Sequence, residues 1–257
     1  MTASNEALKS LLYATADDLL ILGHRNSEWT GLGPLLEEDI AFSSMAQDQL
    51  GQSLALYEIL QRDLGEKDPD TIAFLRPENE YRCCHLVEYP IGSYAFSLMR
   101  HFLFDQASYL RFAALAESSF EPLALVSRKL LGEIKYHIMH GNTWMAQLSR
   151  GGEESHARMQ SALNEAFPMA LGIFEELEHE QELIDAGVYP GAAQLREQWL
   201  QHIEPAVAHG GLELPAVNGQ DSGAVYFGGR KGYHSEHLGS LIEEMGEVLR
   251  SDPAADW

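Results

Sequence analysis

Apolar residues recur along most of this chain at the three- and four-residue spacing of a single helix face. The first predicted helix covers about residues 7–25, and its apolar stripe consists of Leu8, Leu11, Leu12, Leu19 and Leu22. A Gly-Leu-Gly-Pro sequence at 31–34 then separates it from a second predicted helix over about residues 35–63. The apolar side of that helix consists of Ile40, Leu50, Leu54 and Leu60.

Turn signals divide the rest of the chain. Residues 65–91 contain three X-Pro pairs and predict a looser stretch, and residues 210–233 are Gly-rich and irregular. The remaining predicted helices cover about residues 92–118, 121–148, 153–185, 192–208 and 235–250. Pro168 predicts a kink in the helix over 153–185. Long helices without an alternating strand pattern predict one all-α bundle over residues 1–257.

Composition narrows the class of protein further. The chain has 257 residues, of which 45% are hydrophobic, and its formal charge is -22 from 39 acidic and 17 basic residues. Such acidity disfavours nucleic acid and anionic membrane surfaces as partners. The two cysteines, Cys83 and Cys84, are adjacent and offer no disulfide framework. No apolar signal region or membrane-length apolar run occurs, so we expect a cytoplasmic protein.

Isolated acidic residues lie in three of the long helices. In a ferritin-like di-iron bundle, two helices each supply one Glu and two each supply Glu-x-x-His, all pointing inward. Here the third residue after Glu133 is Tyr136, and the third after Asp48 is Gly51. We therefore predict an inward polar network without a functional metal, formed by Asp48, Asp105, Glu133 and His137. Weak iron binding by these oxygens and one histidine is the alternative.

Two literal acid-x-x-His pairs occur elsewhere, at Glu153/His156 and Glu176/His179. The first follows a Gly-Gly pair at a helix start, and the second lies in a run that is charged on every side. We expect both pairs to be solvated. On the first predicted helix, Asp17 or Asp18 is a further candidate for the inward network, and the sequence does not distinguish between them.

A basic spot near the C-terminus interrupts the acidic chain. The segment 228–239 reads GGRKGYHSEHLG, and a Gly-rich basic turn before a helix can bind phosphate or carboxylate. Its candidate partner or ligand contacts are Arg230, Lys231, His234, Glu236 and His237. The alternative is a structural turn in which Ser235 caps the last helix and Glu236 lies in its first turn. The segment matches neither a P-loop nor an H-E-x-x-H zinc motif.

Several short blocks, distributed over nearly the whole chain, resemble one family. They are LGHR at 22–25 with EW at 28–29, LEEDIA at 36–41, Asp48 with LGQ at 50–52, DTIAF at 70–74, VEYP at 87–90, EIKYH at 133–137 and the segment 228–239. The most specific block is the segment 228–239. Together the blocks resemble the C subunit of bacterial phenylacetyl-CoA epoxidase, a multicomponent monooxygenase of aerobic phenylacetate breakdown.

The resemblance implies a ferritin-like helical bundle with extra C-terminal helices, and a structural subunit without catalytic residues of its own. It implies pairing with a catalytic di-iron A subunit and further assembly with a small B subunit. A reductase with flavin and an iron-sulfur cluster would supply electrons from NADPH, and the complex would form the ring-1,2-epoxide of phenylacetyl-CoA. Asp48, Asp105, Glu133 and His137 would then be remnants of ligand positions that persist as a polar network.

Two other functions remain open from the sequence. The chain could be a di-iron oxygenase or ferroxidase in its own right with unusual ligands, although the missing Glu-x-x-His pairs argue against it. It could also be a helical acyl-CoA-binding module anchored by Arg230 and Lys231. Self-association is a further possibility for its assembly.

Overall fold

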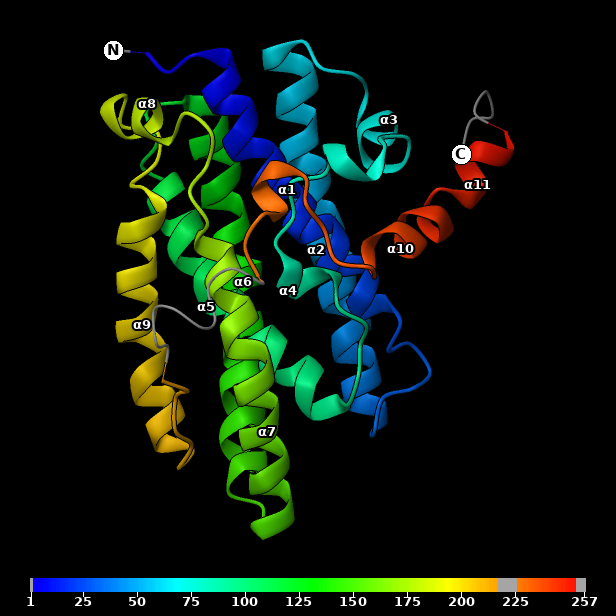
Figure 1. Cartoon of the computed structure of the whole chain (residues 1–257), viewed down its shortest axis with the longest axis vertical. Coiled ribbons are helices and arrows are strands. Elements are labelled where there is room, and N and C mark those ends of the chain that lie inside the picture. The colour runs from blue at the N-terminus through cyan, green and yellow to red at the C-terminus, as the bar shows by residue number, and fades with distance from the viewer. Residues whose placement is uncertain (1, 217–225, 253–257) are drawn as a thin grey trace.

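A computed structural model describes residues 2–216 and 226–252. These residues form helices and no strand, which confirms the all-α prediction. Helix α1 (Asn5–Ser27) packs along α2 (Leu36–Leu64), and α5 (Tyr94–Leu115) packs against α6 (Glu121–Ser149) and α7 (Glu153–Ala170). Helix α6 also contacts α2, so the two pairs join into one bundle. Helix α9 (Ala192–His209) flanks α5 on the outside (Figure 1).

Short elements connect and extend this bundle. The predicted loose stretch contains three of them, which are α3 (Pro69–Phe74), the 3-10 turn η1 (Glu78–Glu80) and α4 (His85–Glu88). Beyond α7 follow η2 (Leu171–Phe174), α8 (Glu180–Asp185), η3 (Gly229–Lys231), α10 (Leu238–Met245) and α11 (Glu247–Ser251). Helices α10 and α11 project to one side of the bundle (Figure 1).

The helix ends follow from local chemistry. The Ser4 hydroxyl accepts a hydrogen bond from Ala7 N at the start of α1, and Ser93 does the same for Phe96 N at the start of α5. Asp68 caps α3, whose first residue is a proline. Helix α2 ends at Gly65, which adopts φ 73°, a left-handed conformation that glycine tolerates best.

The predicted helix over 153–185 is wrong in its second half. Helix α7 contains Pro168 and ends at Ala170, and the chain is extended at Glu175 before α8 begins. The cause is tertiary. The Glu175 carboxylate accepts a hydrogen bond from Gly228 N at 2.7 Å, and a Cβ at Gly172 would lie 2.6 Å from the carbonyl oxygen of Tyr226. A continuous helix over these residues would remove the contacts that Gly172 and Glu175 make with the C-terminal segment.

The predicted helix over 235–250 is also divided. Helix α10 begins at Leu238 and not at Ser235, and Gly246 separates α10 from α11. The backbone N–H of Ser235 donates instead to the Glu88 carboxylate at 2.7 Å, which holds this residue in the turn before α10. Ser235 Oγ accepts a weak hydrogen bond from His237 N at 3.4 Å, so it stabilises that turn and not the helix proper.

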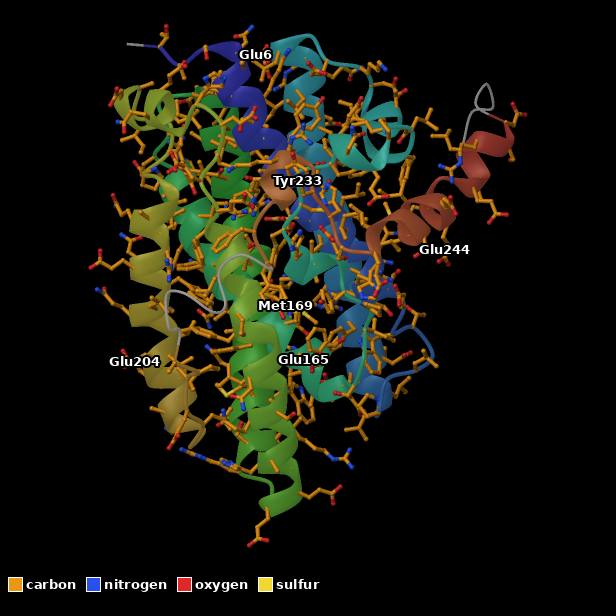
Figure 2. The ribbon with its side chains drawn as sticks, in the orientation of Figure 1. Glu6, Glu165, Met169, Glu204, Tyr233 and Glu244 are labelled. Carbon is orange, nitrogen blue, oxygen red and sulfur yellow. The ribbon has the colours of Figure 1, made fainter. Side chains whose placement is uncertain are left out.

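Acidic side chains project from the outer helices, among them Glu204 on α9 and Glu244 on α10 (Figure 2). Within the described ranges, no helix combines the length and the apolar character that crossing a membrane requires. The strong negative charge is thus displayed on the outside, around a core in which α1 is buried on almost every face.

Candidate functional site: a buried histidine and carboxylate network

Three of the four predicted network residues meet between α2, α5 and α6. His137 of α6 lies with Nε2 3.0 Å from Asp48 Oδ2 of α2 and with Nδ1 3.9 Å from Asp105 Oδ1 of α5. Glu133, one turn earlier on α6, accepts a hydrogen bond from Gln52 Nε2 at 3.1 Å. The structure therefore brings Asp48, Asp105 and His137 together, whereas Glu133 pairs across the same helix interface with a glutamine.

A second branch continues from Asp105 towards the start of α2. His101 Nδ1 is in ion-pair contact with Asp105 Oδ2, and His101 Nε2 lies 3.3 Å from His140 Nδ1. His140 Nε2 lies 2.9 Å from Glu38 Oε2, which also accepts a 2.5 Å hydrogen bond from the Tyr94 hydroxyl. Together the two branches form one connected series of polar side chains from Tyr94 to Asp48.

Helical spacing explains why these side chains share an interior. His101 and Asp105 are four residues apart on α5, so they lie on one face. On α6, Glu133 and His137 have the same spacing and His140 follows three residues later. Because α2 and α6 are neighbours, the polar side of α2 meets this face of α6 along several turns.

The hydrogen bonds of the second branch depend on the tautomers of its two rings. A neutral imidazole has one N–H donor and one acceptor nitrogen, so the placement of these hydrogens decides which atom donates between His101 and His140 and between His140 and Glu38. The contact between His101 and Asp105 extends the branch as an ion pair when the ring is protonated. The two rings thus lie between two acidic ends, Asp105 and Glu38.

Electrostatics favour an ionised Glu38. Burial alone would raise the pKa of this carboxyl, but hydrogen bonds from His140 and Tyr94 outweigh that effect and hold the pKa below its usual range. Burial and the neighbouring Glu38 carboxylate raise the pKa of Tyr94, which keeps its hydroxyl protonated as the donor. The Glu38 side chain is only 3% exposed, so the charge depends on these internal partners.

The network does not fit a pair of iron ions. A metal ligand must offer an unprotonated nitrogen or oxygen towards a common point. Asp48 and Asp105 instead lie at opposite nitrogens of the His137 ring, and His101 and His140 lie between Asp105 and Glu38 and contact each other. Among the described residues, the donor atoms of these groups do not converge on one ion.

Sequence reasoning did not assign Glu38 or Tyr94 to the network. A signal for Glu38 existed, because it precedes Gln52 by fourteen residues, close to four helical turns, which places both on one side of α2. Tyr94 had no comparable signal. It lies near the start of α5, and its hydroxyl reaches Glu38 only because of how α5 is positioned against α2.

Asp17 and Asp18 are both buried, but neither joins this network. Asp17 accepts hydrogen bonds from Arg76, Tyr57 and the backbone of Arg82. Asp18 binds Arg230 through two contacts of 2.8 Å and also Arg111 at 3.2 Å. Burial would raise the pKa of Asp18, and the two guanidinium groups instead hold it below its usual range.

The expected outside contact of Arg230 does not fit its position. Its side chain is 2% exposed, and its guanidinium also donates to the carbonyl oxygens of Ala14, Arg82 and Ile173. This arginine thus fastens the C-terminal segment to α1, and its guanidinium is not exposed for the acyl-CoA contact that was considered for Arg230 and Lys231. Lys231 and Glu236, by contrast, are exposed and remain candidates for a partner contact.

His234 has an internal role of the same kind. Its Nδ1 lies 2.8 Å from Glu88 Oε1 and its Nε2 lies 3.0 Å from the Tyr81 carbonyl oxygen. Burial opposes ionisation of Glu88, but the hydrogen bond and charge of His234 lower the pKa of that carboxyl. The buried thiol of Cys83 lies 3.6 Å from the same carboxylate, and burial raises the pKa of this thiol. Both ring nitrogens are used, so the cluster is closed by its own hydrogen bonds.

His237 lies at the edge of this region. Its ring packs against Tyr89 with centroids 4.9 Å apart, and its carbonyl oxygen accepts a hydrogen bond from Arg25 Nη2 at 3.2 Å. The predicted contact segment is therefore held mainly by α1 and α4 of its own chain.

The two literal acid-x-x-His pairs lie at helix boundaries. Glu153 and Glu176 are exposed, and the ring of His156 is directed to the Ser149 carbonyl oxygen at 2.9 Å. His179 precedes α8 with φ 60° and pairs with Glu182. Neither pair reaches the interior of the bundle.

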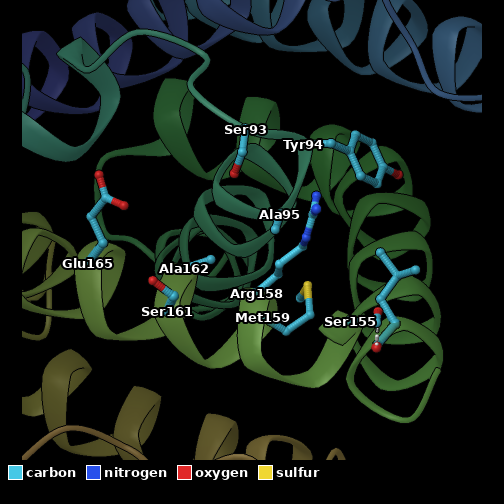
Figure 3. Close-up of a pocket in the computed structure, with 10 residues that line it drawn as sticks. Ser93, Tyr94, Ala95, Ser155, Arg158, Met159, Ser161, Ala162 and Glu165 are labelled. Atoms are coloured by element: carbon cyan, nitrogen blue, oxygen red, sulfur yellow. Dashed lines mark hydrogen bonds between the residues drawn. The ribbon is translucent and has the colours of Figure 1, made fainter. Parts of the chain in front are cut away.

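A cavity of about 380 Å³ opens between the start of α5 and helix α7. Its walls include Tyr94, Met159, Ala162, Glu165 and Arg158 (Figure 3). Tyr94 connects this cavity to the polar network, because its hydroxyl donates to Glu38. The Arg158 side chain forms an exposed pair with Glu154, so the cavity has no buried charge that would fix an ionic ligand.

An all-α bundle with inward carboxylates and histidines on facing helices defines the class as ferritin-like. The family model described as phenylacetic acid catabolic protein matches residues 1–257. The C subunit of 1,2-phenylacetyl-CoA epoxidase from Escherichia coli (strain K12) is 32% identical over 241 residues, which cover 94% of this chain and 95% of that protein. The chain belongs to the phenylacetic acid catabolic protein family, which confirms the resemblance found in the sequence.

Proposed function

We propose that this chain is a non-catalytic structural subunit of a phenylacetyl-CoA epoxidase, in which it supports a catalytic di-iron A subunit. The observation that carries the proposal is that the inward histidines of the bundle contact side chains of the same chain. His101 and His140 contact each other and the carboxylates of Asp105 and Glu38, and His137 is directed at Asp48, so the inward imidazoles point at groups of the same chain and not at one common position. The Escherichia coli relative is named as one subunit of an epoxidase, which supports a role inside a complex of several chains.

In this proposal, the cofactors act elsewhere in the complex. Iron would be held by the A subunit, and a reductase with flavin and an iron-sulfur cluster would deliver electrons from NADPH. A small B subunit would complete the assembly. The role of this chain is to present a rigid helical surface that covers apolar parts of the A subunit, since obligate subunits bury large and mainly hydrophobic interfaces.

The test is to express the A subunit with and without this chain. We expect the A subunit alone to be poorly soluble or inactive, and co-expression to restore soluble protein and NADPH-dependent turnover of phenylacetyl-CoA. An A subunit that is soluble and fully active by itself contradicts the structural role.

Iron content provides the second readout. The isolated chain is reconstituted anaerobically with ferrous iron, and loosely held metal is then removed. We expect almost no iron to remain. Retention of about one or two iron ions per chain, as in a di-iron bundle, overturns the proposal and makes Asp48, Asp105, Glu133 and His137 the first ligands to replace.

A further inference from the structure

Helices α2 and α6 expose several large apolar side chains along neighbouring stripes, and we call this surface the α2–α6 face. It consists of Leu36, Ile40, Gly51 and Leu54 on α2 and of Tyr136 and Met139 on α6. Leu36 is 71% exposed, and Ile40 and Met139 are each 59% exposed. On each helix these positions share one stripe beside the interface at which Asp48 meets His137. Large apolar side chains grouped in this way mark an interaction surface.

The charge of this face differs from that of the molecule. The exposed positions of α2 between Ile40 and Leu54 are uncharged, and Asp48 beside them is bound to His137. On α6, the exposed charges near the face are basic, and Lys129 and Lys135 form no ion pair among the described residues. In a chain with 39 acidic and 17 basic residues, this is an unusual local balance. The face therefore fits a partner whose apolar surface has an acidic border.

Two glycines in mid-helix supply an independent observation. Gly51 on α2 and Gly132 on α6 are both exposed, and a Cβ at either position would meet no atom within 4 Å. Glycine weakens a helix, and among the described residues no atom lies close enough to require the missing side chain at either place. The residues that follow them, Gln52 and Glu133, are hydrogen-bonded to each other, so each glycine lies one residue from the interface between α2 and α6. Such positions allow another backbone to approach closely.

We propose that the α2–α6 face docks a helix of the catalytic A subunit, whose backbone crosses the bundle at Gly51 and Gly132. This inference rests on the proposed function, because it identifies the surface by which the structural subunit meets its partner. A second copy of this chain fits less well. In a two-fold symmetric pair the same face meets itself, so neither copy supplies the acidic border that would complement Lys129 and Lys135.

A neighbouring cavity offers a place for an anchoring side chain. Leu54, one turn after Gly51, also lines a cavity of about 240 Å³ together with Leu20, Leu50 and Phe74. The energy of protein interfaces is concentrated where a large side chain of one partner enters such an apolar pocket. We therefore expect an aromatic or long aliphatic side chain of the docked helix to enter at Leu54.

The experiment measures the affinity between the purified chain and the A subunit for matched variants. Gly51→Gln adds a soluble, helix-compatible side chain to the face, and Ala193→Gln adds the same side chain at an exposed position of α9. We expect Gly51→Gln to weaken binding on the order of 100-fold and Ala193→Gln to leave it unchanged. Circular dichroism checks that both variants remain folded. If Gly51→Gln is unfolded, Tyr136→Ser at an exposed side chain replaces it, with the same expected loss.

The outcomes separate the surface from the function. If the unmodified chain does not bind the A subunit, the proposed function fails, and this inference fails with it. If the unmodified chain binds and the face variants bind equally well, the function stands and the assigned surface is wrong. If sedimentation shows that the face joins two copies of this chain and Gly51→Gln separates them, a second copy occupies the face and the assignment to the A subunit is wrong.

Discussion

Two groups of buried charges lie in this bundle, and they are built differently. Where the C-terminal segment meets α1, carboxylates bind arginines, as in the Asp18–Arg230 pair, in which both side chains are at most 2% exposed. Between α2, α5 and α6, carboxylates bind histidines, and one end of the network, Asp48, is 35% exposed. Guanidinium groups keep their charge at every pH at which the protein is folded, whereas imidazoles exchange protons near neutrality.

The difference indicates separate roles. The arginine pairs fix one geometry, because removal of either partner leaves a charge in an apolar interior. The histidine contacts depend on which ring nitrogens carry hydrogen, so their donors and acceptors can be exchanged without moving the side chains.

The largest expected effect comes from breaking the arginine pair. Arg230→Met should lower the free energy of unfolding by roughly 3–5 kcal/mol, because Asp18 remains buried without its main counter-charge. Urea unfolding followed by circular dichroism measures the loss. The matched control is Lys231→Met at the exposed neighbouring position, where a change within about 0.5 kcal/mol is expected. A loss below about 1 kcal/mol for Arg230→Met would show that the pair does not fasten the segment.

The histidine network should respond less and mainly through pH. Glu38→Gln should cost about 1–3 kcal/mol at neutral pH, since its partners Tyr94 and His140 lose a carboxylate. The folded pKa of Glu38 is lowered, so its stabilisation is present above the unfolded value of about 4.3 and disappears as the pH falls through the folded value. The variant should therefore lose less stability than the parent between neutral pH and acid.

Urea unfolding at a series of pH values makes this comparison. The control is Glu37→Gln, an exposed neighbour that should retain the acid dependence of the parent. Equal acid dependence in the parent and in Glu38→Gln would mean that Glu38 is not held as an ion by the network.

The smallest effect, of opposite sign, is expected at the α2–α6 face. Gly51→Ala should stabilise the isolated chain by about 0.4–1 kcal/mol, because the added methyl meets open space and alanine favours the helix. Thermal or urea unfolding of the chain without partners measures it. Destabilisation would mean that Gly51 serves the fold itself, which would remove one support of the docking proposal.

The long helices could be predicted from the sequence because their periodicity is local. The first, second and fourth predicted helices differ from α1, α2 and α6 by at most two residues at each end. The prediction over 153–185 failed because the chain turns at Gly172 and Glu175 to meet residues 226 and 228, and no local pattern encodes that contact.

The candidate site divides in the same way. The ligand pattern of a di-iron bundle and the family resemblance selected Asp48, Asp105 and His137 as inward groups, and the structure brings them together. They were not enough to show which turn of α5 faces Glu38, so Tyr94 was missed. Arg230 was assigned to the surface because its partner Asp18 lies 212 residues away, and a basic residue in a Gly-rich turn gives no sign of such a partner.

The distance between Asp18 and Arg230 also sets an order of events during synthesis. Domains begin to fold while the chain is still being made, and contacts between remote residues form late. A growing chain exposes Asp18 early, Arg111 follows 93 residues later, and the main partner Arg230 follows only 212 residues later. Helices α1 and α2 can pair before then, yet the interior around Asp18 closes only when Arg230 has left the ribosome. The C-terminal segment thus completes the interior last. A chain stopped before residue 230 would lack the main partner of Asp18, and α1 would remain incompletely packed.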